Sequence, residues 1–413
     1  MLHDESAASR KSLLAAPAAD LAGFSLPVYT GHGLFNLAVS LAHVCGVSIS
    51  DEHAELCLPG GKPASEVWAR YQQVVFFLVD GLGDSFLAAN RAVAPNLWRD
   101  RIAQISSVFP STTATAITTL MTAQPAAAHG LLGWYVRDEQ SDSIVAPLPM
   151  RNRASASGPD PLVVQRLLRS APMLGRALRK THVVTLKDLT RGPYSSFHAA
   201  GARVHGYAAL SDLPEAVTHA LAECRDPSYV YAYTPLLDRT AHDFGIDSAA
   251  SREVLQQVDA AYAEMRRRLP EALFIVAADH GFIDNPPECQ ISLTDHPDLL
   301  AMLRAPLSGE RRAAYCHVKP EYVEAFGRLI DVRFGKVLLA LPAARAFEAG
   351  LFGPGEVDAE TRKRAGDWIL IGRGNWTVQD QLEGEASHPM IGVHGGLSPE
   401  EMRVPLIVGQ PVT

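Results

Sequence analysis

Seven short runs of apolar residues occur along the chain, each rich in Val, Ile, Leu, Phe or Tyr. The apolar side chains follow one another directly instead of alternating with polar ones. This flat pattern is typical of strands that are buried on both faces, as in a parallel sheet. The predicted strands occupy residues 74–79, 182–186, 229–233, 273–277, 337–341, 368–371 and 404–408.

Several segments between these runs show the periodicity of amphipathic helices, most clearly residues 251–269. Apolar side chains recur there every three or four positions, at Val254, Val258, Tyr262, Met265 and Leu269. Strands that alternate with helices predict an α/β fold, with helices on both faces of a mostly parallel sheet. Ligands of such folds bind at the carboxyl ends of the strands, so the residues after each run are the candidates for a binding or catalytic site.

The chain carries no obvious domain boundary. No tract rich in Pro, Gly or Ser divides its 413 residues, and no internal repeat is present. We therefore expect residues 1–413 to form a single domain. Residues 296–376 are a candidate small α/β insert or cap within it, because 321–328 has a helical pattern and 337–341 a strand-like one.

The charge and cysteine content of the chain limit the partners and the cell compartment that we expect for this protein. The chain has 45 acidic and 37 basic residues, a net charge of −8 and no long basic run, which disfavours nucleic acid and anionic membranes as partners. No run of eighteen apolar residues occurs, so we expect no membrane span. Residues 1–19 lack the apolar core of a secretory signal. Five scattered cysteines without a CxxC pair indicate free thiols in a reducing cytoplasm.

Side chains suited to metal binding or nucleophilic attack follow some of the predicted strands. Asp80 ends the run 74–79 and precedes a glycine, although such an acid can equally cap a helix. Residues 111–113, Ser-Thr-Thr, follow Pro110 at the start of a helix-like stretch. Free N–H groups at a helix N-terminus favour anions, and an ordinary N-cap is the alternative for these hydroxyls.

Three further segments contribute histidines. Asp238 and His242 are four residues apart, which places both on one face of a helical turn, and a solvated pair is the alternative. Asp279 and His280 directly follow the run 273–277, where a buried histidine bonded to its neighbour is the alternative. His394 lies among glycines, and only the presence of the other segments makes it a candidate ligand.

Together these segments supply three carboxylates and three histidines. Six such ligands suit two divalent metal ions, zinc first and manganese as the alternative. Two ions about 4 Å apart can hold the attacking and the departing oxygen of an in-line displacement. They would also activate a threonine hydroxyl, which is a poor nucleophile by itself. Metal-neutralised carboxylates would let an anionic phosphate enter an acidic protein.

These residues, in this order, resemble the alkaline phosphatase superfamily, and most closely its nucleotide pyrophosphatase/phosphodiesterase branch. The resemblance covers roughly residues 74–408 and implies a three-layer α/β/α sandwich. It implies a threonine nucleophile, which counting back from His129-Gly130 assigns to Thr113, with Thr112 as the alternative. It also implies two metal sites, one formed by Asp80, Thr113, Asp279 and His280 and the other by Asp238, His242 and His394.

The chain departs from the branch at two points. The usual Thr-Gly reads Thr122-Ala123, and Trp134 stands where the phosphodiesterases usually have an asparagine that helps to bind the phosphoryl group. This change indicates an aromatic wall, with Trp134 and Tyr135 as candidate lining residues and ordinary packing as the alternative. Residues 393–402 also resemble the matching segment of cofactor-independent phosphoglycerate mutases, phosphopentomutases and PglZ-type domains.

The resemblance therefore implies a metal-dependent phosphohydrolase that cleaves phosphodiester or nucleotide pyrophosphate bonds of a small phosphorylated substrate. A phosphomonoesterase or phosphonate hydrolase is one alternative within the superfamily, and a phosphomutase with a closing lid is another. A non-catalytic module like the PglZ domains is the alternative outside enzymes. The sequence carries no sign of the oligomeric state.

Overall fold

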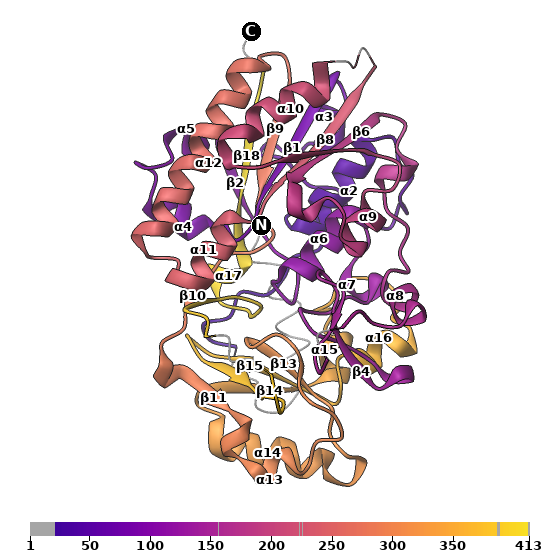
Figure 1. Ribbon diagram of the computed structural model, residues 1–413, viewed down its shortest axis with the longest axis vertical. Helices are drawn as coiled ribbons and strands as arrows, with labels where there is room; N and C mark the ends of the chain where they lie inside the picture. The colour runs from indigo at the N-terminus through magenta and orange to yellow at the C-terminus, as the bar shows by residue number, and fades with distance from the viewer. Residues whose placement is uncertain (1–20, 156, 223, 225, 386–388, 412–413) are drawn as a thin grey trace.

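A seven-stranded sheet lies at the centre of the computed structural model, which describes residues 21–411 except 156, 223, 225 and 386–388 (Figure 1). The strand order is β2-β18-β9-β1-β8-β6-β7, and only β18 runs antiparallel to its neighbours. The strands are β1 (Gln73–Val79), β2 (Arg101–Ser106), β6 (Lys180–Leu186), β7 (Arg203–Tyr207), β8 (Ser228–Thr234), β9 (Leu273–Ala277) and β18 (Arg403–Gly409).

Burial explains which strands the apolar pattern predicts. Five of the predicted runs form β1, β6, β8, β9 and β18, and every residue of β1 after Gln73 is buried. The sequence prediction missed β2 and β7, which form the two edges of the sheet. Only the last residue of β7 is buried, so its side chains carry no apolar run.

Helices cover both faces of this sheet, which confirms the predicted α/β layers (Figure 1). One layer contains α2 (Leu34–Val44), α3 (Ala64–Trp68), α6 (Thr113–Thr122) and α9 (Pro193–His198). The other contains α4 (Asp84–Ala89), α5 (Pro95–Asp100), α10 (Leu213–Ala222), α11 (Leu236–Phe244) and α12 (Ala249–Arg268).

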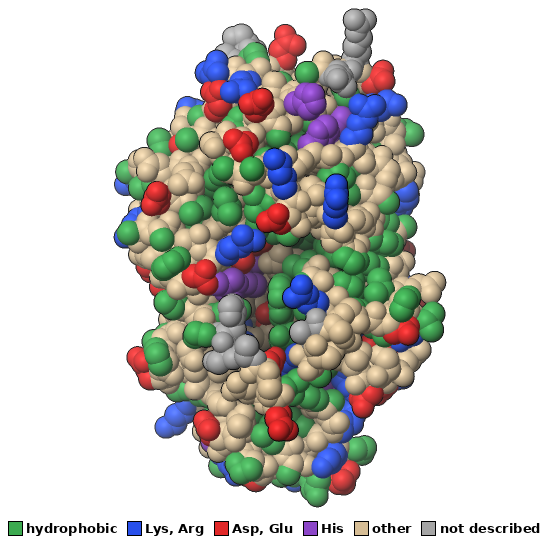
Figure 2. Space-filling model, in the orientation of Figure 1, with side chains coloured by type: hydrophobic (Ala, Val, Ile, Leu, Met, Phe, Trp, Pro, Cys, Tyr) green, Lys and Arg blue, Asp and Glu red, His purple; other side chains and the backbone are tan. Residues whose placement is uncertain are grey.

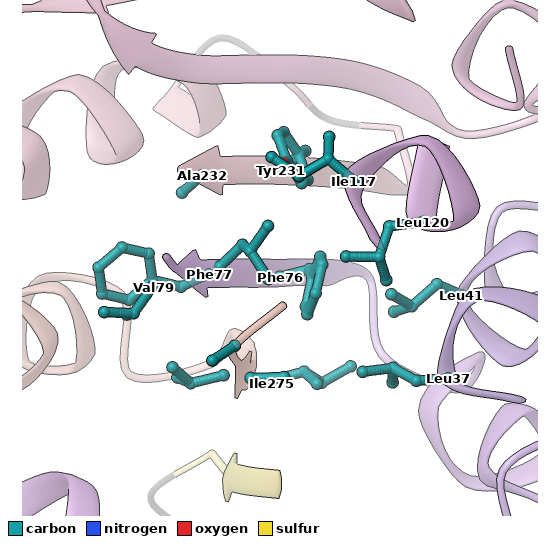
Figure 3. Close-up of a cluster of buried hydrophobic side chains, with 14 of the residues drawn as sticks. Leu37, Leu41, Phe76, Phe77, Val79, Ile117, Leu120, Tyr231, Ala232 and Ile275 are labelled. Atoms are coloured by element: carbon teal, nitrogen blue, oxygen red, sulfur yellow. The ribbon is translucent and has the colours of Figure 1, made fainter. Parts of the chain in front are cut away.

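The first helix layer packs on the sheet through leucine and isoleucine side chains. Leu41 of α2 and Leu120 of α6 lie next to Phe76 of β1, and Leu37 of α2 lies next to Ile275 of β9 (Figure 3). These side chains are almost completely buried. Burying each contributes about 1.5–3 kcal/mol relative to exposure, so this contact holds α6, and with it residue 113, against the sheet.

Two of the predicted strands, both within the candidate insert 296–376, belong to a second sheet, which is antiparallel and not parallel as their flat apolar pattern indicated. The runs at 337–341 and 368–371 form β14 (Leu338–Pro342) and β15 (Trp368–Gly372) of an antiparallel sheet with the order β12-β13-β15-β14. Apolar runs report burial but not the sheet that a strand joins. This sheet lies in the lower part of Figure 1, with α14 (Val323–Phe334) packed on β14.

The second sheet also contains β12 (Ser308–Gly309) and β13 (Ala313–Cys316). The remaining strands are β3 (Val136–Asp138), β4 (Ser143–Ala146), β5 (Arg151–Asn152), β10 (Ile283–Asp284), β11 (Gln290–Ser292), β16 (Thr377–Gln379) and β17 (Gly392–Val393). The helices are α7 (Ala126–His129), α8 (Pro161–Leu167), α13 (Pro297–Leu300), α15 (Ala343–Glu348), α16 (Ala359–Arg364) and α17 (Pro399–Met402).

Four further expectations concern the segment 296–376, the cysteines, membrane spans and the N-terminal residues. Elements β12 to β15 fall inside residues 296–376, and the role of this segment as an insert or cap in a single domain stays a prediction. All five cysteines are free, as expected. Within the described part of the chain, no helix combines the length and apolarity that crossing a membrane requires. The expectation for residues 1–19 falls outside the described residues.

Candidate active site

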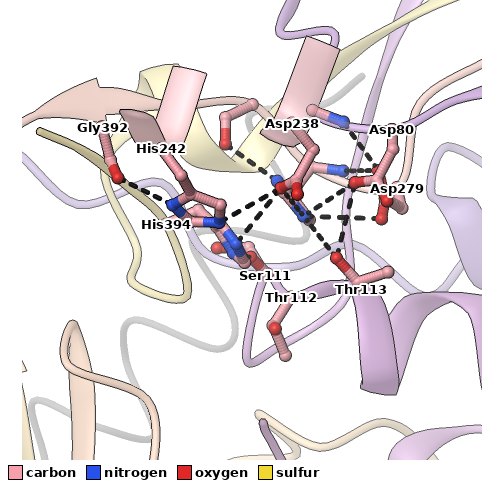
Figure 4. A network of polar contacts seen from close by, with 12 residues as sticks. Asp80, Ser111, Thr112, Thr113, Asp238, His242, Asp279, Gly392 and His394 are labelled. Atoms are coloured by element: carbon pink, nitrogen blue, oxygen red, sulfur yellow. Dashed lines mark hydrogen bonds and ion pairs between the residues drawn. The ribbon is translucent and has the colours of Figure 1, made fainter. Parts of the chain in front are cut away.

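The candidate metal ligands and the candidate nucleophile converge at the carboxyl ends of the central parallel strands (Figure 4). They come from five segments that are far apart in sequence: the ends of β1 and β9, the start of α6, the helix α11 and the loop after β17. The structure brings together all seven predicted residues, which are Asp80, Thr113, Asp238, His242, Asp279, His280 and His394.

Asp80 is held at the end of β1 by a tight turn. Gly81 adopts a positive φ of +77°, and a Cβ there would lie 2.5 Å from the Phe282 ring, so this position requires glycine. The Gly81 N–H donates to Oδ1 of Asp279 at 3.0 Å, which joins the ends of β1 and β9. The Tyr233 hydroxyl donates to Oδ2 of Asp80, and the sequence analysis had not singled out this tyrosine.

The two candidate nucleophiles face different partners. Thr113 is the first residue of α6, and its Oγ1 lies 3.1 Å from His280 Nε2 and 3.4 Å from Asp80 Oδ1. Thr112 is the N-cap residue, and its hydroxyl donates to Oε1 of Glu310 at 2.6 Å. Only the Thr113 hydroxyl therefore contacts candidate metal ligands, which favours it over Thr112.

The three histidines share one orientation. In each, Nδ1 lies within hydrogen-bonding distance of a backbone carbonyl, which can only accept, so Nδ1 carries the proton. The carbonyls are those of Gly392 for His242 (2.9 Å), Gly281 for His280 (3.0 Å) and Ser111 for His394 (3.1 Å). This tautomer leaves the lone pair of each Nε2 for a metal ion, as in most histidine metal sites.

Asp238 lies at the centre of the cluster. Its Oδ1 lies 3.4 Å from Nε2 of His242, 3.6 Å from that of His394 and 3.9 Å from that of His280. Two ligand groups result, one of Asp238, His242 and His394 and one of Asp80, Asp238 and His280. The first is a set that the sequence resemblance implies, whereas the second contains Asp238 in place of Asp279.

Unsatisfied oxygens indicate what this cluster can bind. Oδ1 of Asp238 and Oδ2 of Asp279 are buried and accept no hydrogen bond from any described residue. Asp279 Oδ2 lies 3.4 Å from His280 Nε2, so it also faces the cluster. Buried carboxylate oxygens without donors are costly unless a cation compensates them. The donor set of carboxylates and Nε2 atoms thus fits divalent metal ions.

The electrostatics of the cluster agree with this donor set. Burial raises the pKa of Asp80 well above its usual value, and the charges of Asp279 and Asp238 add to the shift. Burial also opposes ionisation of Asp238, but in the absence of metal a protonated His242 holds the pKa of Asp238 below the usual range, and Asp238 raises the pKa of His242 against the effect of burial. Burial, with repulsion from His280, lowers the pKa of His394, which keeps its imidazole neutral and able to ligate.

The predicted lining residues lie beside the nucleophile segment. Trp134 is 37% exposed, and Tyr135 packs under the Arg153 guanidinium at 4.8 Å from its ring centre. Tyr135 also pairs with Gly309 of β12 through two backbone hydrogen bonds. Figure 2 shows histidine side chains beside a hollow between the upper and lower parts of the molecule. Whether the two aromatic side chains line a substrate pocket stays a prediction.

Glu310 is a site residue that sequence reasoning missed. It follows β12 in the second sheet, and its Oε1 accepts both the Thr112 hydroxyl and the Trp134 N–H, each at 2.6 Å. Burial raises its pKa to about 7, against the opposing effect of the bond from Thr112. A single glutamate in a loop carries no periodic signal, and only the tertiary approach of the second sheet brings it to the site.

The sequence matches one family over most of the described chain. Residues 74–397 match the family described as type I phosphodiesterase / nucleotide pyrophosphatase. Among curated protein sequences, no relative matches the chain.

Solved structures with similar folds include two kinds of enzyme. Murine ectonucleotide pyrophosphatase / phosphodiesterase 5 superposes with a TM-score of 0.60 at 17% identity, covering 82% of this chain and 88% of that chain. Its inactive threonine-to-alanine variant in complex with AMP gives 0.59, with the same identity and coverage. Phosphonoacetate hydrolase from Sinorhizobium meliloti 1021 in complex with phosphonoformate gives 0.59 at 18% identity, covering 82% and 90%. These likenesses confirm the expected alkaline-phosphatase-like fold.

Proposed function

The chain belongs to the type I phosphodiesterase / nucleotide pyrophosphatase family, and from this premise we propose that it cleaves phosphodiester or nucleotide pyrophosphate bonds with Thr113 as the nucleophile and two bound metal ions. Family membership makes it a hydrolase of phosphoric ester or anhydride bonds. The bond it prefers, the nucleophile and the metal ions belong to the proposal.

One observation carries the proposal. Three histidines from separate segments present the unprotonated Nε2 to the same carboxylate oxygen of Asp238, while Thr113 Oγ1 lies beside His280 and Asp80. A structural cluster of histidines has no need to direct every Nε2 toward one unsatisfied carboxylate. A metal-assisted phosphoryl transfer needs this arrangement next to a hydroxyl.

The residues divide the ligands between two positions. Asp80, Asp279, His280 and Thr113 would hold one ion, and Asp238, His242 and His394 the other, with Asp238 near enough to serve both. Such ions would lower the pKa of the threonine hydroxyl and neutralise charge on the phosphoryl group. Mixed oxygen and nitrogen ligands suit zinc, with manganese as the alternative.

The chain's own groups then perform the bond exchange. The Thr113 hydroxyl gives its proton to solvent and its Oγ1 attacks phosphorus. The bond from phosphorus to the departing oxygen breaks in line with the new one, and that oxygen leaves with the electron pair and takes up a proton from solvent. The free N–H groups at the start of α6 point at the transferred group and stabilise its negative charge. Water cleaves the resulting phosphothreonine, which returns the hydroxyl to Thr113 and releases the phosphorylated product. An inactive threonine-to-alanine variant of the murine enzyme supports a threonine in this role.

A phosphonate is the second candidate substrate class. The Sinorhizobium phosphonoacetate hydrolase has a similar fold at nearly the same TM-score as the murine phosphodiesterase. A phosphonate places carbon where an ester places the departing oxygen, so the same cluster could serve either reaction. We propose a cytoplasmic location on the basis of the five free cysteines.

The substitution Thr113→Ala tests the nucleophile. We expect it to lower the turnover of p-nitrophenyl esters by at least about 1,000-fold, because the Thr112 hydroxyl, the alternative nucleophile, bonds to Glu310 and not to the ligand cluster. Metal content, measured in parallel by elemental analysis, should stay near two ions per chain. Thr112→Val provides the comparison, since it removes the other candidate hydroxyl. Normal turnover in Thr113→Ala would transfer the role to Thr112 or exclude a covalent route.

A further inference from the structure

We propose that Glu310 is a positioning residue for the nucleophile, supplied to the active site by the second sheet. This inference rests on the proposed function, because it assigns a role within the same site. Glu310 lies in the turn between β12 and β13. Among the described residues, its carboxylate hydrogen-bonds to Thr112 and Trp134 and to no member of the metal-ligand cluster, so it acts through the segments around the cluster.

Through one oxygen atom, Glu310 joins two segments that are separate in sequence. Its Oε1 accepts the Thr112 hydroxyl and the Trp134 N–H, each at 2.6 Å. Its aliphatic stem also packs against the segment after β17, where a Cβ on Gly395 would lie 2.6 Å from the Glu310 Cγ. One side chain therefore contacts the segment before Thr113, the aromatic segment and the residue that follows His394.

The hydrogen bond to Glu310 keeps the Thr112 hydroxyl from capping helix α6. Thr112 has the extended backbone of an N-cap, with φ of −140° and ψ of 149°, but its side chain makes no capping hydrogen bond. An N-cap hydroxyl normally accepts an N–H of the first helical turn. Because Glu310 holds this hydroxyl, the N–H groups of the first turn of α6 stay available to an anionic group.

The same turn also supports the opposite side of the site. Arg312 is completely buried and pairs with the buried Glu401 at 2.8 Å. Glu401 in turn accepts the Gly396 N–H at 2.7 Å, and the Gly396 carbonyl accepts the Ser111 hydroxyl at 2.8 Å. The turn that contains Glu310 is thus fixed by buried contacts. These contacts tie the turn to the segments on both sides of the nucleophile.

Two substitutions of Glu310 test whether its carboxylate positions the nucleophile or takes part in the reaction through its charge or proton. Glu310→Gln keeps an acceptor oxygen for both hydrogen bonds, so we expect kcat for bis-p-nitrophenyl phosphate within about threefold of wild type. Glu310→Ala removes the acceptor and should lower kcat by about 100-fold with little change in KM, because a displaced nucleophile reacts slowly without losing substrate contacts. Both should keep the wild-type metal content. Glu324→Ala, on the exposed face of α14, is the matched control.

Three results would overturn the inference. Glu310→Ala could retain wild-type kcat, Glu310→Gln could lose as much as Glu310→Ala, or Glu310→Ala could lose its metal ions. The second result would mean that charge or proton transfer matters instead of the acceptor oxygen. The third would mean that the residue supports the ligand cluster itself.

A double-mutant cycle keeps the test independent of the proposed function. Glu310→Ala and Thr112→Val remove the same hydrogen bond, so their losses of melting temperature should not add in the double variant. Additive losses would contradict the inference even if the protein hydrolyses no ester. The opposite outcome is also informative: the losses of melting temperature do not add, but the metal-loaded wild-type protein hydrolyses no ester. That result would reject the proposed function but would still show that Glu310 and Thr112 interact.

Discussion

His129, the histidine that locates Thr113 by its spacing in the sequence, has a structural role. Its Nδ1 accepts the Leu131 N–H at 3.1 Å, so its Nε2 carries the proton and donates to the Thr119 hydroxyl at 3.1 Å. The ring therefore ties α6 to the loop after α7. Burial, with repulsion from His198 and Arg169, lowers its pKa to about 3.

This shift predicts a pH dependence of stability. The unfolded chain protonates His129 below a pKa of about 6.5, whereas the folded protein keeps it neutral, so its contribution is present above that pH and is lost as the pH falls. Between pH 8 and pH 5, wild type should lose about 2 kcal/mol more unfolding free energy than His129→Gln. Urea unfolding of metal-free protein at both pH values measures the difference. Equal losses would show that the folded protein also protonates His129.

At the scale of residues, the sequence located the candidate ligands that the structure brings together, but not the residues that support them. Asp80, Asp279 and His280 could be selected as candidates because strand ends of a parallel sheet meet at one edge. The positions of Glu310 and Tyr233 at the site depend on tertiary packing. The candidate group of Asp80, Asp238 and His280 likewise differs from the set that the resemblance implies, because the spacing of motifs does not tell which carboxylates approach one another in the fold.

At the scale of elements, the loop after β9 explains the glycine that follows Asp279 and His280. A Cβ on Gly281 would lie 2.0 Å from the Glu400 carbonyl oxygen and 2.8 Å from the Gly83 Cα. The loops after β9 and β1 therefore pack backbone to backbone against the segment before β18. This close approach brings the ends of the three strands together under the ligand cluster.

The substitution Gly281→Ala should accordingly destabilise the fold. We expect a loss of about 2–3 kcal/mol in unfolding free energy, because neither the carbonyl nor the backbone of Gly83 can move without shifting its element. Chemical denaturation measures the loss. Gly158→Ala is the control, since a Cβ there meets no atom within 4 Å and its φ is not positive. A Gly281→Ala variant as stable as this control would disprove the close packing of the loops.

Strand prediction succeeded where burial was uniform and failed where it was not. Central strands such as β1 and β9 are covered on both faces, so their sequences are continuously apolar. The edge strand β7 exposes most of its side chains, and β14 and β15 are buried in a different sheet. Local hydrophobicity records the degree of burial, whereas pairing partners depend on residues far apart in sequence.

At the scale of the whole molecule, the ligand cluster joins segments from Asp80 to His394, so metal binding and folding should be linked. Without metal, the buried carboxylates of Asp80, Asp238 and Asp279 repel one another. We expect exhaustive chelation at pH 8 to lower the melting temperature by several degrees, because ligands that bind only the folded state stabilise it. Zinc or manganese should restore it. An unchanged melting temperature after verified metal removal would argue against a buried metal site.

The central claim is that this protein is a two-metal hydrolase of phosphodiester bonds. A substrate panel on zinc-loaded and manganese-loaded protein tests it most directly, comparing bis-p-nitrophenyl phosphate, the p-nitrophenyl ester of a nucleotide, p-nitrophenyl phosphate and phosphonoacetate. We expect the two diesters to be hydrolysed faster than the monoester and the phosphonate, and only with metal present. Faster monoester or phosphonate turnover, or no turnover by protein that carries two metal ions, would contradict it.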